Sequence, residues 1–409
     1  MDYNRRSTDP KDAHESEDGL LNIGADEFAA AFGESLEKTL NIDNWRVGDD
    51  IAAAHERLER EITESIAQEN DLRDRIRNEL FPLVFSHPQA PRKAGYYQAS
   101  PAKIESVQRG LLFNGAVEAC NGISMVHDSL ALTVAQIGVS AISYRGDSGT
   151  WVQRLFRRDL RLKGESPIAE VFSLLQRRAE DPRAEGFELR DVLSKLSRRA
   201  IMTFAEHSVL LHKCSAPWRM AHGTPTPHEL LTGAGLMIEG EMPLLSESLK
   251  VWRELLVKHK KWIFVLNAPA KPFWQTLGSA LHPLEYAFVD TPLSVMSEVI
   301  KHLPRPLKDE AKAFVDDIGP RIVVGIYRAS KSASPRVFYA HEDCAHDAAL
   351  IVIADSALRE HRGSPLLLDL ASQVCQTSFG AGDFEAVVQQ AYVQAGAPFH
   401  YFDNREVRL

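Results

Sequence analysis

The sequence predicts a mixed α/β domain that follows a long amphipathic helix. Apolar strand candidates recur along the chain, and most of them are separated by stretches with helical spacing. Early strands that can pair as a hairpin, followed by strands that alternate with helices, are typical of a mixed sheet flanked by helices. The 409 residues, 44% hydrophobic and 25% charged, allow either two domains or one large α/β domain with extensions.

The N-terminal part of the chain is expected to be helical and polar. Residues 1–20 carry many charges and have little to bury, so we expect them to be disordered. Residues 21–100 form a predicted helical region, in which apolar side chains recur over residues 49–80 at spacings near three, four or seven. This pattern predicts one long amphipathic helix. It either packs on a partner helix, as in a homodimer, or folds back on its own domain.

Residues 101–409 are expected to form the α/β domain. Its predicted strands cover residues 110–117, 134–144, 262–266, 321–327 and 336–340. Its predicted helices cover residues 168–178, 189–214, 244–259 and 345–360. The sequence has no fixed-period repeat and no GxxxxGK[ST] phosphate loop, so we do not expect this chain to hydrolyse nucleotides by itself.

Charge and cysteine content limit the partners and the compartment. The formal net charge is −9, so any contact with nucleic acid would depend on local basic patches or on bridging metal ions. The four cysteines are scattered without CxxC spacing, which favours a reducing cytoplasm over a disulfide framework or a zinc ribbon. No stretch approaches the roughly 20 apolar residues of a membrane span, and the polar N-terminus does not resemble a signal peptide. We therefore expect a cytoplasmic protein without a membrane partner.

The most informative block is CNGISMVHDSLALTVAQIGVSAISYRGDSGTW, which runs from Cys120 to Trp151. Asn121, Gly122 and Ile123 are predicted to form a polar turn, followed by Asp128 and a long apolar run. A carboxylate at the position of Asn121 would lie beside buried strands, which is a suitable place for a divalent metal ion. The amide that stands there is a much weaker ligand.

A second block surrounds Glu206 in SRRAIMTFAEHSVLLHK. This stretch is mostly apolar, and a buried carboxylate is costly unless it is paired or bound to a metal. From these residues alone, Glu206 either performs such a role, lies on the solvent-exposed face, or pairs with Arg198 or Arg199.

Further polar residues follow in the next two blocks. His222 can bind a divalent ion through a neutral imidazole, or it can be a turn or core histidine. Glu229 and Glu239 lie shortly after it and could supply carboxylate oxygens instead. Lys261 and Lys271 flank a predicted strand and loop, where they either face phosphate or are simply solvated.

The C-terminal block contains the sequence ADSALREHRGSPLLLDLAS. His361 and Arg362 precede an apolar helical stretch that carries Asp369 and Ser372. Arg362 could contact phosphate, because a guanidinium group offers forked donors to paired oxygens. The alternative is a structured turn with a surface cation. Asp355, at the edge of an apolar run, could be a helix cap.

These blocks, in this order, resemble the motifs of the NurA nucleases from about residue 110 to the C-terminus. In that family Asp-Gly-Ser or Asp-Gly-Thr stands where this chain has Asn121-Gly122-Ile123. A catalytic Glu on a helix is best matched by Glu206, and His222 stands near the expected second Asp-Gly-Ser/Thr. His-Arg-Gly-x-Pro then precedes an apolar helix with acidic residues, as at His361 and Asp369.

The resemblance implies a ribonuclease-H-like α/β core, a dimer, and hydrolysis of DNA phosphodiester bonds with Mn²⁺ or Mg²⁺. It also implies a role in DNA end processing, repair or phage defence beside HerA, a hexameric DNA-translocating ATPase. The catalytic positions implied are Asn121, Glu206, His222 and Asp369. The metal ligands implied are Glu206, Asp128, Asp369 and Glu229. The residues expected to contact DNA are Arg145, Lys261, Lys271, His361 and Arg362.

Three positions depart from the family pattern, because Asn121, His222 and Ser372 stand where acidic residues are expected. Three hypotheses follow. The first is an active nuclease whose metal ligands have moved to other acidic residues. The second is a catalytically degenerate NurA fold that binds DNA or docks a motor. The third is a scaffold that assembles through residues 49–80.

Overall fold

The computed structural model describes residues 24–45, 49–129, 132–146, 148–157, 195–266, 271–301 and 303–399. The chain divides into two compact units, Met1–Asp71 and Leu72–Leu409. The domain boundary predicted between residues 100 and 101 lies within the second unit. The expected disorder of residues 1–20 and the helix expected over residues 168–178 lie outside the described residues.

The first unit is helical. Its elements are α1 (Ala25–Phe32), α2 (Leu36–Leu40), η1 (Ile42–Asn44) and the greater part of α3 (Asp49–Arg75). α1 begins after Gly24 and ends at Gly33, which adopts the left-handed conformation typical of a helix C-terminus. On α3, the apolar side chains Ile51, Leu58, Ile62 and Ile66 are exposed. This apolar stripe therefore has little packing within the described part of the chain.

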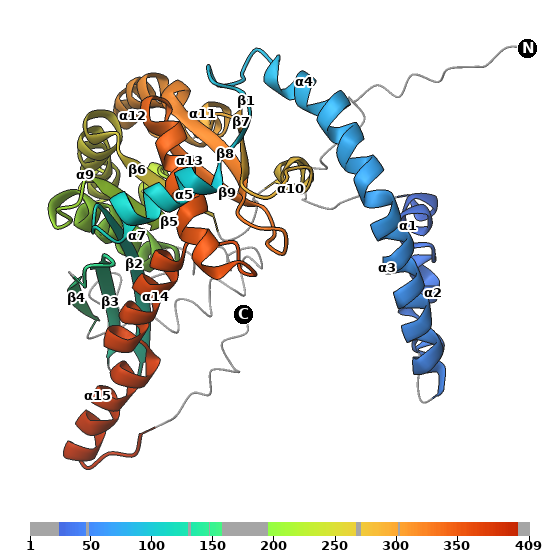
Figure 1. Ribbon diagram of the computed structural model, residues 1–409. Coiled ribbons are helices and arrows are strands. Elements are labelled where there is room, and N and C mark those ends of the chain that lie inside the picture. Colours follow the sequence, from blue (N-terminus) through green and yellow to red (C-terminus); the bar gives the residue numbers. More distant parts are fainter. Residues whose placement is uncertain are drawn as a thin grey trace, which may run out of the picture. The chain divides into compact units, whose positions relative to one another are not determined.

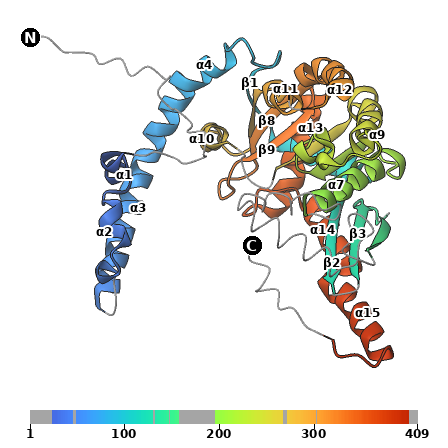
Figure 2. The same ribbon diagram turned by 180° about the vertical axis from the view of Figure 1, so that it is seen from behind.

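The second unit is built on a mixed sheet, whose described strands follow the order β1-β7-β8-β9-β6-β5-β2-β3-β4 (Figures 1 and 2). β2, β5 and β6 are parallel neighbours, and every other neighbouring pair is antiparallel. The sheet is thus mixed, as the sequence predicts. The strands are β1 (Gly95–Gln98), β2 (Val117–Asp128), β3 (Thr133–Ile142), β4 (Ser148–Arg157), β5 (Trp218–His222), β6 (Trp262–Val265), β7 (Glu285–Asp290), β8 (Ile322–Arg328) and β9 (Arg336–His341).

Helices cover both faces of the sheet (Figure 1). One hydrophobic core joins the sheet to α7 (Lys195–His212), α9 (Pro243–Trp252) and α12 (Arg305–Ile318). The other joins it to α5 (Pro101–Val107), α13 (Ala345–Ser356) and α14 (Leu366–Phe379). We call these the α7 face and the α14 face. The remaining helices are α4 (Phe81–Phe85), α8 (His228–Leu231), α10 (Pro272–Ser279), α11 (Leu293–Ile300) and α15 (Ala381–Gln394).

Short 3-10 and π segments extend or join these helices. These segments are η2 (Ile76–Leu80), η3 (Gln108–Leu112), η5 (Gly233–Gly235), η6 (Arg253–His259), η7 (Gly319–Arg321), η8 (Glu342–Cys344) and η9 (Ala357–Arg359). No helix within the described ranges is long and apolar enough to cross a membrane.

The alternation of side chains along the parallel strands explains the two cores. Cys120 of β2 and Ala221 of β5 belong to the core on the α7 face, whereas Ala119 and Met220 belong to the core on the α14 face. Because successive side chains of a strand point to opposite faces, a residue's position in this alternation indicates which helices it meets. This alternation therefore decides on which face of the sheet each candidate site residue of a strand lies.

Several sequence predictions are confirmed and two are wrong. β3, β6, β8 and β9 lie within one or two residues of their predicted bounds. The strand predicted over residues 110–117 is wrong, because η3 extends to Leu112, a turn follows it, and β2 begins only at Val117. The turn predicted at residues 121–123 is also wrong. These residues lie inside β2, where Asn121 pairs with Ser140 and Ile123 with Gly138 of β3.

A buried ion pair fixes the segment after α3 to the sheet. The Arg77 guanidinium on η2 donates to both carboxylate oxygens of Glu285 on β7, at 2.6 and 3.2 Å. Arg77 also lies over the Tyr96 ring, 4.6 Å from its centroid. The Glu285 carboxylate accepts a further hydrogen bond from the His282 backbone at 2.7 Å. Both charges are therefore compensated within the second unit.

Candidate functional site

The candidate site lies at the carboxyl ends of the parallel strands. β5 ends at His222 and β6 at Val265, and these two residues are partners in the sheet. The Gly223 N–H donates to the Val265 carbonyl at 3.0 Å. β9 runs in the opposite direction and begins beside them at Arg336. In open α/β sheets, ligands bind outside the carboxyl ends of parallel strands.

Two guanidinium groups share one carboxylate at this edge, and a third lies beside them. Arg359 and Arg362 contact the same oxygen of Asp369, at 3.2 and 3.3 Å. Arg336 donates to the Arg362 carbonyl at 3.1 Å, and its charge, like that of Arg362, acts on His222. We call Arg336, Arg359, Arg362, Asp369 and His222 the arginine cluster. It carries more positive than negative charge, and the Arg362 side chain is 54% exposed. An anion would be attracted to it.

The turn that presents Arg362 is held in one conformation. Gly363 has a φ of +67°, and a side chain there would approach the Ala333 Cβ to 2.8 Å. The buried Tyr327 hydroxyl donates to the Gly363 carbonyl at 3.1 Å. The glycine of the His-Arg-Gly sequence is therefore required by the backbone conformation and by the close approach of Ala333. The Arg362 side chain therefore extends from a turn that Gly363 and the Tyr327 hydroxyl hold in place.

Two polar atoms in the arginine cluster have no protein partner. Nδ1 of His222 and Nε of Arg336 are buried without a hydrogen bond to any described residue. Burial lowers the pKa of His222, and the charges of Arg336 and Arg362 lower it further, against the opposing effects of the Val265 carbonyl and Asp369. The imidazole is therefore neutral at neutral pH. Buried polar atoms normally have partners, so these two indicate a place for solvent or a ligand.

Asn121 lies on the same face of the sheet as His222. Its partner on β3, Ser140, donates a hydrogen bond to the Ala371 carbonyl of α14 at 2.8 Å. Directly opposed residues on paired strands point to the same face, so Asn121 also faces α14. His222 follows Met220 by two positions and shares its face. The structure thus places Asn121, His222 and Asp369 on the α14 face.

Glu206 lies on the other face of the sheet. It is a buried residue of α7, and its backbone carbonyl lies 3.8 Å from the Cys120 sulfur on β2. Burial raises the pKa of Glu206 to about 8, and the charge of Glu229 raises it as well. A hydrogen bond from the Gly122 backbone and the charge of Arg199 act in the opposite direction. Glu206 is therefore largely protonated at neutral pH.

Glu229 lies near Glu206, and an ion pair with Arg199 already compensates its negative charge. Its carboxylate is 8% exposed and lies 2.9 Å from Nε of Arg199, whose side chain is 68% exposed. We call Glu206 and Glu229 the acid pair. Of the alternatives that the sequence leaves open, Arg199 does lie near Glu206, but the nearer ion pair joins Arg199 to Glu229.

The packing of β2 against the acid pair depends on Gly122. A Cβ atom at this position would lie 2.8 Å from Cγ of Met202 and 2.9 Å from Oε1 of Glu206. We expect Gly122→Ala to lower the free energy of unfolding by about 1–3 kcal/mol, because β2 and α7 must separate to admit the methyl group. Urea unfolding measures this decrease. Gly110→Ala is the control, since a Cβ there meets nothing within 4 Å, and an equal decrease in both variants would contradict the close approach at Gly122.

The predicted metal ligands do not form one centre. No group of three or more His, Cys, Asp and Glu side chains is placed to hold a metal ion within the described ranges. Glu206 and Asp369 lie on opposite faces, and Glu229 and Asp369 are paired with arginines. Asp128 ends β2, seven residues or roughly 23 Å along the strand from Asn121. Hard cations such as Mn²⁺ and Mg²⁺ need several ionised oxygen ligands. The described residues do not fit such an ion.

The residues predicted to contact DNA separate into two groups. His361 and Arg362 lie at the arginine cluster, and both are exposed. Lys261 and Arg145 are exposed elsewhere, Lys261 just before β6 and Arg145 just after β3. Lys271 pairs with Asp290 at 3.4 Å and lies over the Trp274 ring. The structure brings only the first group to the carboxyl edge.

Sequence reasoning missed Arg336 and Arg359. Arg359 precedes Arg362 by three residues, a spacing that places two side chains on one side of a helical turn, and this signal was available. Arg336 begins a strand that lies 26 residues earlier in the chain. Only the pairing of β9 with β6 brings it to the site.

Comparison with known proteins gives a structural likeness only. No family model and no curated protein matches the sequence. Among solved structures, the NurA nuclease from Sulfolobus solfataricus is 9% identical, with 74% of this chain and 95% of that chain covered and a TM-score of 0.41. NurA bound to dAMP and manganese is 10% identical, with 82% and 97% covered and a TM-score of 0.37. At these values the likeness carries no conclusion about residues or chemistry.

Proposed function

We propose that this chain is a NurA-like DNA-binding protein that contacts the DNA backbone through the arginine cluster. The observation that carries the proposal is the excess of guanidinium groups around His222 and Asp369 at the carboxyl edge of the parallel strands. The sequence blocks around Asn121, Glu206 and His361, which occur in the order of the NurA motifs, support the choice of DNA as the ligand.

The chemistry of the cluster suits a phosphodiester. Arginine offers forked N–H donors to paired phosphate oxygens, and Arg362 is exposed enough to reach them. The unpartnered Nε of Arg336 and Nδ1 of His222 lie deeper and provide further polar atoms. Since the only carboxylate in the cluster, Asp369, is shared by two arginines, positive charge remains available to DNA.

The biological setting follows from the NurA resemblance. We propose a cytoplasmic role in DNA end processing, repair or phage defence, with a ribonuclease-H-like core and a HerA-type hexameric ATPase as partner. The absence of a GxxxxGK[ST] loop from the sequence supports a separate motor. The apolar stripe on α3 supports assembly as a homodimer through residues 49–80, because it is exposed in the described structure.

DNA binding by arginine variants tests the proposal. We expect the double variant Arg336→Gln/Arg362→Gln to bind a short DNA duplex at least tenfold more weakly at low salt, measured by fluorescence anisotropy. The slope of log affinity against log salt should also fall by about two, because the variant neutralises two fewer phosphates. Lys261→Gln is the control, because Lys261 is exposed away from the carboxyl edge. Equal weakening in both proteins, or unchanged binding by the double variant, would contradict the proposed site.

A second candidate function is a metal-dependent DNA nuclease, exonuclease or endonuclease. It is favoured by the acid pair, because Glu206 and Glu229 act on each other on the α7 face and Glu206 lies close to Gly122, inside the block where the resemblance places catalytic residues. The test is incubation of end-labelled single- and double-stranded DNA with wild type and Glu206→Gln in Mn²⁺ or Mg²⁺. Cleavage by wild type alone would establish the nuclease. If both proteins bind DNA and leave it intact, the degenerate DNA-binding or motor-docking function holds.

A further inference from the structure

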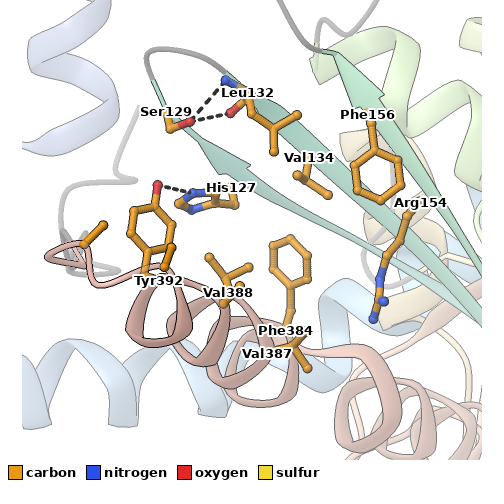
Figure 3. Close-up of a pocket in the computed structure, with 13 residues that line it drawn as sticks. His127, Ser129, Leu132, Val134, Arg154, Phe156, Phe384, Val387, Val388 and Tyr392 are labelled. Carbon is orange, nitrogen blue, oxygen red and sulfur yellow. Dashed lines mark hydrogen bonds between the residues drawn. The ribbon is translucent and has the colours of Figure 1, made fainter.

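An apolar groove lies between α15 and the edge of the sheet where β2 and β4 end and β3 begins (Figure 3). Its cavity has a volume of about 390 Å³. Leu132, Val134 and Phe156 line it from the sheet side, and Phe384, Val387 and Val388 line it from α15. Figure 3 shows the side chains of the two walls pointing toward one another.

The groove leaves apolar surface uncovered by the described residues. Phe156 is 61% exposed and Val387 is 44% exposed. Exposed apolar patches on soluble proteins commonly mark a place where another segment or molecule binds. The walls also carry one cation, Arg154, whose Nε donates to Gln136 at 2.7 Å. An occupant should therefore combine apolar side chains with a nearby acid.

The chain returns to this groove after α15. Gly396 has a φ of +66°, and the Ala397 N–H donates to the Tyr392 carbonyl at 3.0 Å, so the chain reverses beyond the helix. Phe399, the last described residue, lies with its ring centroid 5.5 Å from Tyr392 and 6.2 Å from His127. Tyr392 and His127 line the groove and are hydrogen-bonded to each other at 3.1 Å.

We propose that the C-terminal segment, residues 400–409, occupies this groove within the same chain. The segment reads HYFDNREVRL and begins where Phe399 meets the groove wall. Ten residues reach at most roughly 35 Å, which is ample for a groove whose wall Phe399 already contacts. Tyr401 and Phe402 match the apolar walls, and Asp403 or Glu406 can pair with Arg154.

A peptide-binding experiment tests the assignment. A labelled peptide of residues 400–409 is titrated by fluorescence anisotropy with the full chain and with a variant that ends at Phe399. We expect the shortened variant to bind the peptide at least tenfold more tightly, because the full chain's own segment competes for the groove. Equal binding by the two proteins, or no binding by the shortened one, would overturn the proposal.

Matched substitutions locate the binding. In the shortened variant, Val387→Asp and Phe156→Ser should each weaken peptide binding at least tenfold, and both positions are exposed enough to preserve folding. Val393→Asp is the control, because Val393 is 70% exposed on the same helix and lies outside the groove. Equal weakening by all three would overturn the assignment. So would groove-dependent association of shortened chains in light scattering, which would make a second copy the occupant.

Discussion

Replacing Arg77 with alanine is expected to lower the free energy of unfolding by about 3–5 kcal/mol, because the change leaves a buried carboxylate without its partner. The side chains of Arg77 and Glu285 are 14% and 5% exposed, and two hydrogen bonds join them. Among the described residues, the Glu285 carboxylate would then keep only the His282 backbone donor. Urea unfolding followed by circular dichroism measures the decrease.

Arg75→Ala is the matched control for this prediction. Arg75 lies two positions earlier and pairs with Glu79 at 3.4 Å, but both of these side chains are about two-thirds exposed. Exposed ion pairs typically contribute less than about 1 kcal/mol. If Arg75→Ala and Arg77→Ala lower the stability equally, the Arg77–Glu285 pair does not anchor η2 to the sheet as described.

Glu206→Gln is expected to stabilise the protein at alkaline pH. The pKa of Glu206 is raised from 4.5 to about 8, mainly by burial. Between these pH values the folded state holds a proton that the unfolded state has released, so wild-type stability falls as the pH rises from about 4.5 to about 8. Glutamine resembles the protonated acid and avoids this destabilisation. We expect the variant to be more stable than wild type by about 2–4 kcal/mol at pH 9.

Unfolding at several pH values tests this account of Glu206. The advantage of Glu206→Gln should shrink as the pH falls and should be smallest below about pH 4.5, where the wild-type carboxyl is protonated in both states. Glu241→Gln is the control, because Glu241 is exposed and should show no comparable pH dependence. A pH-independent difference between wild type and Glu206→Gln would show that the carboxyl is not held protonated by the fold.

Much of the fold could be predicted from hydrophobic patterning. β3, β8 and β9 are runs of apolar residues with high strand propensity, and their predicted bounds lie within two residues of the observed ones. β5 was missed because WRMAH is short and contains an arginine and a histidine. Its burial depends on the strands β2 and β6 beside it. The Asn-Gly pair inside β2 suggested a turn, but pairing with β3 overrides that local preference.

The candidate site was predictable only in part. The sequence identified His222, Arg362 and Asp369, and the structure brings these three together. The sequence did not reveal that Glu206 lies on the opposite face, because the face on which Glu206 lies depends on which side of the sheet α7 crosses. Nor could it show that Arg199 neutralises Glu229, since the two belong to different helices, α7 and α8.

These ion pairs bear on the proposed DNA binding. Asn121 and His222 carry no negative charge, and arginines already balance Glu229 and Asp369. The arginine cluster therefore presents the chain's own cations at the carboxyl edge of the sheet. Phosphate can meet guanidinium directly at such a site.

The most direct test of this account is the affinity of the wild-type protein for an end-labelled DNA duplex, measured in EDTA and again in Mn²⁺. The account predicts that the dissociation constant in EDTA is no larger than in Mn²⁺, because arginines supply the positive charge and added Mn²⁺ only competes with them for phosphate. It also predicts that the recovered DNA is intact. Binding that appears only with Mn²⁺, or shortened DNA in the manganese sample alone, would contradict it.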